Sequence, residues 1–304
     1  MNENINNISD EEIFEELKLR FFNNKNSLLD FVELADQLKV VNTKLEESEN
    51  LKTHFLSNIR NQIINPFASI LGLAKSITNM QEGNWQKAVR MSKLIYDEAF
   101  NLDFQLNNIF AAARIEAGEM QPEISQTNIC EIAENVIEAF RHKADHKEIV
   151  IIFKNLLSLN DDGEFLFKTD PYQLQLILSN LLSNSIEYSY AASEIELEMN
   201  YVDNQLIVSF SDKGVGIDEK DQKIIFDRFT RLDTSINSIQ QGHGLGLAIT
   251  KNLIDALNGK IELVSRKRVG SVFKIFVPEG KENEFGEMYA LNSDEFLFND
   301  MENF

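Results

Sequence analysis

The chain has almost no cysteine, and it has fewer basic than acidic residues. Its one cysteine, Cys130, cannot form an internal disulfide, and the surrounding Asn-Ile-Cys-Glu is not a metal-binding pattern. Lys and Arg number 29 against 49 Asp and Glu, so the formal net charge is −20. A surface of this sign repels the phosphates of nucleic acids and of anionic membranes. We therefore expect neither a disulfide scaffold nor a nucleic-acid-binding protein.

Long apolar runs are also missing. No stretch approaches the roughly 18 uninterrupted apolar residues of a membrane-spanning helix. Residues 1–10 are polar and acidic, without the basic start and apolar run of a signal peptide. We therefore expect a soluble, cytoplasmic chain with no direct membrane insertion. Hydrophobic residues make up 43% of the 304 positions, which is enough for a packed core and suggests about two domains.

The first 120 residues show helical periodicity. Residues 1–30 predict a short N-terminal helical segment. From Phe31 onward, apolar residues recur at spacings of three and four, interrupted by a polar break at Ser48 and Lys52. This spacing is typical of a coiled coil. One amphipathic helix packed within a monomer would also explain it, but a seam between two copies is favoured because no nearby segment could cover the stripe.

The same helix is expected to continue through Pro66 to about Asn79, with a bend at the proline. A loop at 81–84 leads to a second helix from about Trp85 to Ala117, and Gly118 is a natural helix stop. Two antiparallel helices cannot bury their apolar stripes alone, whereas two paired hairpins can form a four-helix bundle. We therefore predict that residues 31–120 form a coiled-coil linker and a dimerisation hairpin, most simply in a homodimer.

Residues 121–278 change to a mixed pattern, so the predicted fold class is α+β. Helices are expected at 127–146, at 171–188 and from Gly244 to Asn258, and the apolar alternation predicts strands between them. The predicted strands are 149–153, 164–168, 193–201, 205–212, 260–265 and 271–277. Residues 279–304 form an acidic tail with scattered aromatics, which is either disordered or a partner-docking peptide.

The first chemical motif is Asn180-Leu-Leu-Ser-Asn184 on the predicted helix 171–188. Asn180 and Asn184 are four residues apart and share one helix face. A pair of amides aimed at one site suits hydrated Mg²⁺, which prefers oxygen ligands. A solvated or capped helix would explain the pair equally well if it stood alone.

Two glycine motifs follow. Asp212-Lys-Gly-Val-Gly-Ile217 comes directly after a predicted strand, so Gly214 and Gly216 would let the backbone approach a flat ligand while Asp212 accepts a hydrogen bond from an amine. Gly242-His-Gly-Leu-Gly-Leu247 precedes a helix, whose free amide groups attract phosphates. Each motif alone is weak, and the strand-first context of a Rossmann fold is missing.

In this order, and with Ile225-Phe-Asp-Arg-Phe229 between the second and third, the motifs resemble the nucleotide site of the GHKL superfamily, specifically of sensor histidine kinases. The resemblance covers about residues 50–278. It implies an α/β sandwich with ATP and Mg²⁺ as cofactors, and a response regulator or another histidine kinase as partner. The site residues that it implies are Asn184 as Mg²⁺ ligand with Asn180 beside it, Asp212 at the adenine amine, Gly214 and Gly216 in the pocket wall, Gly242, Gly244 and Gly246 in the phosphate lid, and Arg228 and Arg231 at the phosphates.

Two positions depart from the family pattern. Phe55 to Phe67 resembles the acceptor box, but Asn61-Gln62 stands five residues before Pro66, where the family has a histidine followed by an acid. An amide nitrogen is not a nucleophile at neutral pH, and Gln62 cannot act as a general base. Glu187 stands where the family has a basic residue near the phosphates, which predicts weaker ATP binding or a compensating cation.

The leading hypothesis is therefore a dimeric pseudokinase that binds ATP and Mg²⁺ but has no catalytic acceptor, and that regulates a phosphorelay partner. One alternative is an active kinase with another acceptor, on itself or on a partner. His54 lies two helical turns before Asn61 but has no adjacent acid. Another alternative is a structural scaffold with an empty pocket. His142 and His146 have metal-ligand spacing but no evident third ligand, so a surface role is favoured.

Overall fold

The computed structural model describes residues 14–15, 18–20, 38–39, 41–43, 63–81, 84–160, 163–227 and 244–281. The chain divides into two compact units, Met1–Gln62 and Ile63–Phe304. In the first unit the described residues are helical, and Leu38 and Val41 of the expected seam are each 62% exposed. The coiled coil and the four-part domain division stay predictions. The residues at issue that lie outside the described ranges are His54, Asn61, Gln62, Arg228, Arg231, Gly242 and His243.

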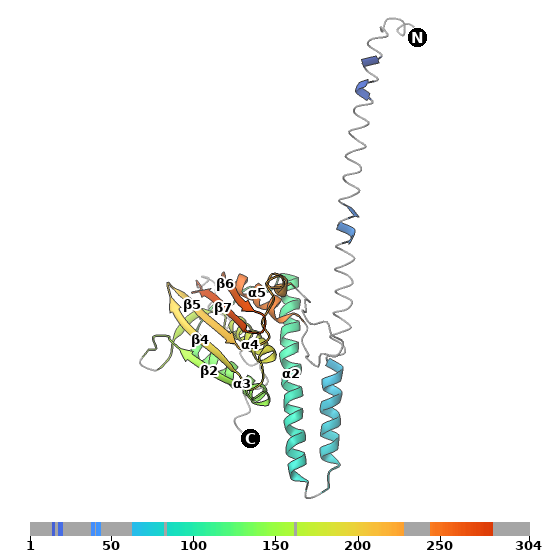
Figure 1. Ribbon diagram of the computed structural model, residues 1–304, viewed down its shortest axis with the longest axis vertical. Coiled ribbons are helices and arrows are strands. Elements are labelled where there is room, and N and C mark those ends of the chain that lie inside the picture. Colours follow the sequence, from blue (N-terminus) through green and yellow to red (C-terminus); the bar gives the residue numbers. More distant parts are fainter. Residues whose placement is uncertain are drawn as a thin grey trace. The chain divides into compact units, whose positions relative to one another are not determined.

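The second unit begins with two helices. Residues 63–78 are helical, Pro66 included, and α2 follows at Trp85–Ala117. The two run side by side in Figure 1. The predicted stop is confirmed, because Gly118 adopts the left-handed conformation (φ 72°) and caps the carbonyl groups of the last turn. Several large apolar side chains of this hairpin are exposed, including Phe67, Leu71, Trp85 and Phe110.

The remainder of the unit contains a five-stranded mixed sheet. Its strands are β2 (Val150–Asn155), β4 (Glu194–Val202), β5 (Gln205–Asp212), β6 (Lys260–Arg266) and β7 (Gly270–Pro278), in the order β2-β4-β5-β7-β6. Only the β2–β4 pair is parallel. A separate two-stranded sheet pairs β1 (Ser125–Asn128) with β3 (Leu166–Thr169).

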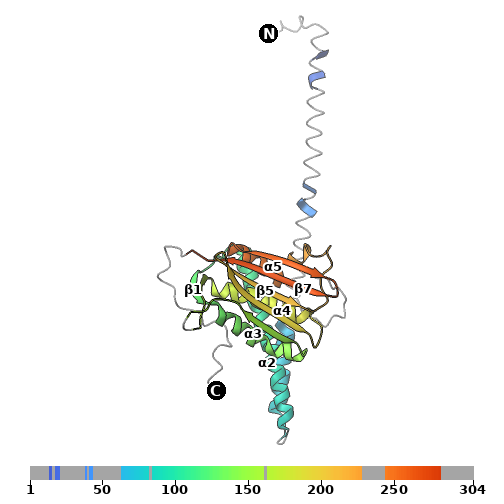
Figure 2. The same ribbon diagram turned by 60° about the vertical axis from the view of Figure 1, so that its left-hand side comes forward.

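Three helices lie over one face of the five-stranded sheet (Figures 1 and 2). They are α3 (Ile129–His146), α4 (Pro171–Tyr188) and α5 (Gly246–Ala256). On β4, Ile195, Leu197 and Met199 are buried toward these helices, because alternate side chains of a strand point to one face. Helix α4 is buried on nearly all sides, and Leu and Ile make up most of its buried side chains.

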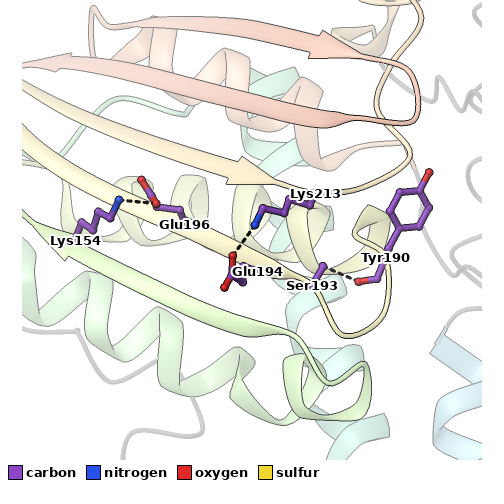
Figure 3. A network of polar contacts seen from close by, with 6 residues as sticks. All are labelled: Lys154, Tyr190, Ser193, Glu194, Glu196 and Lys213. Atoms are coloured by element: carbon purple, nitrogen blue, oxygen red, sulfur yellow. Dashed lines mark hydrogen bonds and ion pairs between the residues drawn. The ribbon is translucent and has the colours of Figure 1, made fainter.

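The opposite face of the sheet carries charge. On β4, Glu194 and Glu196 alternate with the buried side chains. Glu194 pairs with Lys213 at 2.5 Å and Glu196 pairs with Lys154 at 2.6 Å, as Figure 3 shows. These pairs are solvent-exposed and so contribute little to stability. They show instead that this side of the sheet is built to face solvent, and that the core lies between the sheet and its three helices.

From residue 63 to residue 278 the predicted helices and strands are confirmed with three corrections. Strand β1 was not expected, and the strand predicted at 164–168 is β3 at Leu166–Thr169. Helix α3 begins at Ile129 rather than at 127. The physical reason is Asn128, whose side chain accepts a hydrogen bond from the Cys130 amide (3.2 Å) and caps the helix. Within the loop-rich stretch after β5, residues Ile224–Phe226 form a short 3₁₀ helix, η1. None of the helices in the described ranges is long and apolar enough to cross a membrane.

Candidate functional site

Helix α4 carries the paired asparagines, and both side chains end in an amide nitrogen without a partner. Asn180 is 2% exposed, and the Nδ2 atoms of Asn180 and Asn184 are buried and unbonded. An unpaired buried donor is costly, so it is normally retained for a ligand or an ordered water. The helix face predicted from the spacing of the two residues thus offers polar groups that the described protein leaves unsatisfied.

Asp212 ends β5 and is buried, with 7% of its surface exposed. Its Oδ1 atom accepts a hydrogen bond from the backbone amide of Ser271 on β7 (3.2 Å). Burial raises the pKa of Asp212 to about 6, and the backbone amides of Ser271 and Gly214 partly offset that shift. At neutral pH the carboxylate is therefore ionised but poorly solvated, which makes it a strong acceptor for an amine.

The two glycines of this loop have no room for a side chain. A Cβ on Gly214 would lie 2.1 Å from the Tyr188 carbonyl oxygen at the end of α4, and one on Gly216, where φ is +59°, would lie 2.0 Å from the Arg266 oxygen. The Val215 amide also donates to Tyr188 (3.1 Å). The close approach ties the loop after Asp212 to the end of the asparagine helix, so the first two motifs belong to one site.

We expect Gly214→Ala to destabilise this domain and Gly72→Ala to leave it intact. The Gly214 methyl would force backbone apart, a change of the overpacking class that costs about 1–3 kcal/mol. Nothing lies within 4 Å of a Cβ on Gly72, in the helix 63–78. Alanine there should stabilise by roughly 0.5–1 kcal/mol. Thermal melts of both variants test this, and equal melting temperatures would contradict the tight approach.

The third motif opens α5. Gly244 has φ +64°, and no side chain caps the helix start at Leu245. The first-turn amides of Gly246, Leu247 and Ala248 have no bonded acceptor among the described residues. A Cβ on Gly246 would lie 3.5 Å from Asn180 Oδ1. The structure thus brings the third motif against the first.

Glu187 on α4 faces two lysines that the sequence did not connect with it. Its charge acts on Lys143 of α3 and on Lys147, the residue that follows α3, and Lys147 also donates to the carbonyl oxygens of Ile186 (2.9 Å) and Glu187. Burial lowers the pKa of Lys143 to about 8, while Glu187 and Asp97 oppose that shift. The sequence predicted that Glu187 would weaken ATP binding or require a compensating cation. Lys143 and Lys147 are two cations close enough to interact with its charge.

Lys143 is held where the hairpin meets α3. Its ammonium group lies 5.2 Å from the ring centroids of Phe100 and Phe140 and 5.6 Å from that of Phe104. Cation–π attraction offsets part of the cost of burying the charge. Phe100 and Phe104 belong to α2, so this aromatic cage packs the hairpin against the sheet domain.

The histidines four apart on α3 lie at the same contact. Asp97 of α2 sits 3.8 Å from His142 Nε2 and 3.7 Å from His146 Nε2. Burial lowers the pKa of His142, which packs edge-on against Phe100, whereas His146 is 63% exposed. The expected surface role fits His146 but is wrong for His142. Among the described residues no group of three such side chains is arranged to hold a metal.

Comparison with known proteins agrees with this geometry. Residues 169–281 match the family model of the histidine kinase-, DNA gyrase B- and HSP90-like ATPases. Over 248 residues, 81% of the chain, it is 29% identical to the circadian input-output histidine kinase CikA of Synechococcus elongatus. It is 27% identical, over 81% of its length, to the autoinducer 2 sensor kinase/phosphatase LuxQ of Vibrio parahaemolyticus. Residues 169–281 therefore belong to this ATPase family, and the chain resembles sensor histidine kinases over most of its length.

The chain spans only 32% of CikA and 29% of LuxQ. Among solved structures, full-length ShkA in complex with AMPPNP matches 77% of the chain with a TM-score of 0.53 and 22% identity, and the match covers 46% of ShkA. That likeness shows the fold alone. The α+β domain around Asn180 and Asp212 is thus an ATP-binding domain of the histidine kinase type.

Proposed function

We propose that this chain is a pseudokinase of the sensor histidine kinase family, which binds ATP and Mg²⁺ but does not autophosphorylate at the usual position. The observation that carries the proposal is Asn61-Gln62 in the acceptor box. Attack on a γ-phosphate needs a nucleophile and a base to take its proton, and neither amide can serve. Both parts of the acceptor chemistry are missing, while the helix around Pro66 is retained.

The residues present fit the expected nucleotide. Asn184 would hold Mg²⁺ through its oxygen, with Asn180 beside it, and the unpaired Nδ2 atoms would find acceptors in phosphate oxygens. The free amides at the start of α5 suit phosphate in the same way. When bound, the metal supplies charge neutralisation for the phosphates. Asp212, Gly214 and Gly216 form the adenine end of the site, and Arg228, Arg231 and Gly242 are proposed to complete the phosphate end.

Glu187 is the feature that favours a nucleotide-free scaffold. A lone carboxylate near phosphates would oppose ATP binding. Lys143 and Lys147 place two cations within electrostatic range of it, however, so part of its field is offset before ATP arrives. This compensation favours the nucleotide-binding hypothesis over the scaffold.

A dimer is the proposed assembly, either of two copies or with another histidine kinase. The exposed apolar side chains of the hairpin, among them Phe67, Leu71 and Phe110, are the surface that such a bundle would bury. Nucleotide binding or partner contact would shift the hairpin and the ATP-binding domain between two arrangements, provided that the ligand prefers one of them. A response regulator or a second kinase of a two-component phosphorelay is the proposed recipient of that signal.

Retained nucleotide machinery also supports one alternative, an active kinase with another acceptor. The experiment that separates the two is incubation of the purified chain with γ-labelled ATP and Mg²⁺, with Asn184→Ala and His54→Ala variants alongside. We expect ATP binding by calorimetry and no incorporated label. Label that disappears in Asn184→Ala would overturn the pseudokinase proposal, and its loss in His54→Ala would identify the acceptor. Absence of ATP binding would favour the scaffold.

A further inference from the structure

Strand β2 is an edge of the five-stranded sheet, and one side of its backbone is open (Figure 1). The Val150 amide donates to Ser193 (3.0 Å) and the Leu156 amide to Met199 (2.9 Å), so even-numbered residues pair with β4. The alternation of a strand then turns the backbone groups of Ile151 and Phe153 away from β4. Within the described chain these groups have no backbone partner. Such an edge is a template for another strand.

A groove runs along this open edge. It has a volume of about 620 Å³ and lies between β2 and α3. Its floor is apolar and includes Ile137, Ile149, Ile151 and Phe153. A strand added to β2 would therefore gain both main-chain hydrogen bonds and a pocket for every second side chain, the two components of peptide recognition by strand addition.

The rim of the groove is acidic. Its charged residues are Glu134, Glu138 and Asp145 against the single cation Arg141, which is already paired with Glu138 at 2.7 Å. Glu134 and Asp145 therefore have no cationic partner among the residues that the structure describes. An approaching lysine or arginine can lay its aliphatic stem on the apolar floor while its charged end reaches this rim.

We propose that the β2 edge and its groove bind an extended segment of a partner protein in which apolar and basic residues alternate. The main-chain groups of Ile151 and Phe153 pair with the segment, and the carboxylates of Glu134 and Asp145 select its charge. This surface lies on the ATP-binding domain, apart from Asn180, Asn184 and Asp212, so the proposal is independent of the pseudokinase assignment.

Two other occupants fit this rim less well. Residues 282–304 contain seven Asp and Glu and no Lys or Arg, so the chain's own tail carries the same sign as the groove. A second copy of the chain would bring the same acidic rim and a net charge of −20. Like charges brought together in this way oppose association. Charge complementarity therefore points to a basic segment from another protein.

The test uses the full chain and three nine-residue peptides labelled with fluorescein. The first peptide alternates valine and lysine, and the second alternates valine and glutamate. The third has the sequence of the first, but every second backbone amide is N-methylated, so that one edge of the extended peptide cannot donate hydrogen bonds. Fluorescence anisotropy at 0.15 M salt should show binding of the first and at least about tenfold weaker binding of the other two, equivalent to 1.4 kcal/mol or more. Hydrogen exchange should slow at the Ile151 and Phe153 amides.

A matched pair of variants isolates the backbone contribution. Ile151→Ala and Ile151→Pro both remove the apolar side chain, but only proline lacks the outward amide, and proline is tolerated where that amide faces solvent. We expect at least about tenfold weaker binding by Ile151→Pro than by Ile151→Ala, with circular dichroism confirming that both are folded. Equal binding of the lysine and glutamate peptides, or unchanged exchange at Ile151 and Phe153, would overturn the proposal.

Discussion

The double variant Asn61→His/Gln62→Glu is expected to incorporate label from γ-labelled ATP, whereas the wild-type chain is not. The substitutions supply a nucleophile and an adjacent general base in a helix that still contains Pro66. General acid–base assistance contributes about 10²–10⁴-fold to such a transfer, so the double variant should exceed Asn61→His alone by roughly two orders of magnitude.

Two controls test the interpretation of this result. Asn184→Ala in the double-variant background should abolish labelling, because the proposed Mg²⁺ ligand is lost. Acid-labile but base-stable label would indicate a phosphorylated nitrogen. If the double variant binds ATP but remains unlabelled, the defect lies beyond the acceptor box, and the explanation based on Asn61 and Gln62 is wrong.

The sequence was most informative where the governing interactions are local. The bounds of α4 and α2 were predicted closely, because Asp170 caps α4 through the Gln173 amide (2.9 Å) and Gly118 ends α2. The β4–β5 hairpin followed from alternation, and its turn residues Asp203 and Asn204 have the positive φ values of 54° and 59° that such turns require.

Features that depend on distant pairing were not predictable. Strand β1 is a polar Ser-Gln-Thr-Asn segment that becomes a strand only through its pairing with β3, some 40 residues later. Ser271 has no motif of its own, yet the β5–β7 pairing places its amide on Asp212. In each case the side chain or strand acquires its role from tertiary context, which a single sequence does not encode locally.

The Glu187 position shows the same limit at the candidate site. Sequence comparison with the family pattern marked Glu187 as a departure, but could not show what surrounds it. Lys143 lies on α3 and Lys147 directly follows it, and only the packing of α3 on α4 brings them near that carboxylate. Neighbouring charges of this kind can offset the effect of a substitution on the electrostatics of a site.

Asp212→Asn is expected to weaken ATP binding by about 10- to 150-fold, since hydrogen bonds to a charged group are worth about 1.5–3 kcal/mol. The amide oxygen can still accept the Ser271 hydrogen bond, so the loop should keep its conformation. Calorimetric titration with ATP and Mg²⁺ measures the loss. Asp218→Asn is the matched control, because Asp218 follows in the same loop and forms only a 3.6 Å ion pair with Lys267. Equal loss in both variants would contradict the assigned role of Asp212.

The raised pKa of Asp212 gives this variant a second signature with opposite signs in binding and in folding. With a pKa of about 6, the carboxyl is mostly protonated at pH 5, so wild-type affinity should be about tenfold lower at pH 5 than at pH 7.5. Asp212→Asn should lack this pH dependence of ATP affinity. The titration of the ATP phosphates is common to both proteins and cancels in the comparison.

For folding, a raised carboxyl pKa means that the native state holds the proton of Asp212 more tightly than the unfolded state does. The stability contribution of Asp212 is therefore full below pH 3.8 and is lost as the pH rises to about 6. Removing this buried charge should stabilise the nucleotide-free domain at pH 7, by up to about 3 kcal/mol. A variant that melts higher yet binds ATP more weakly would show that the carboxylate is retained for its ligand rather than for the fold.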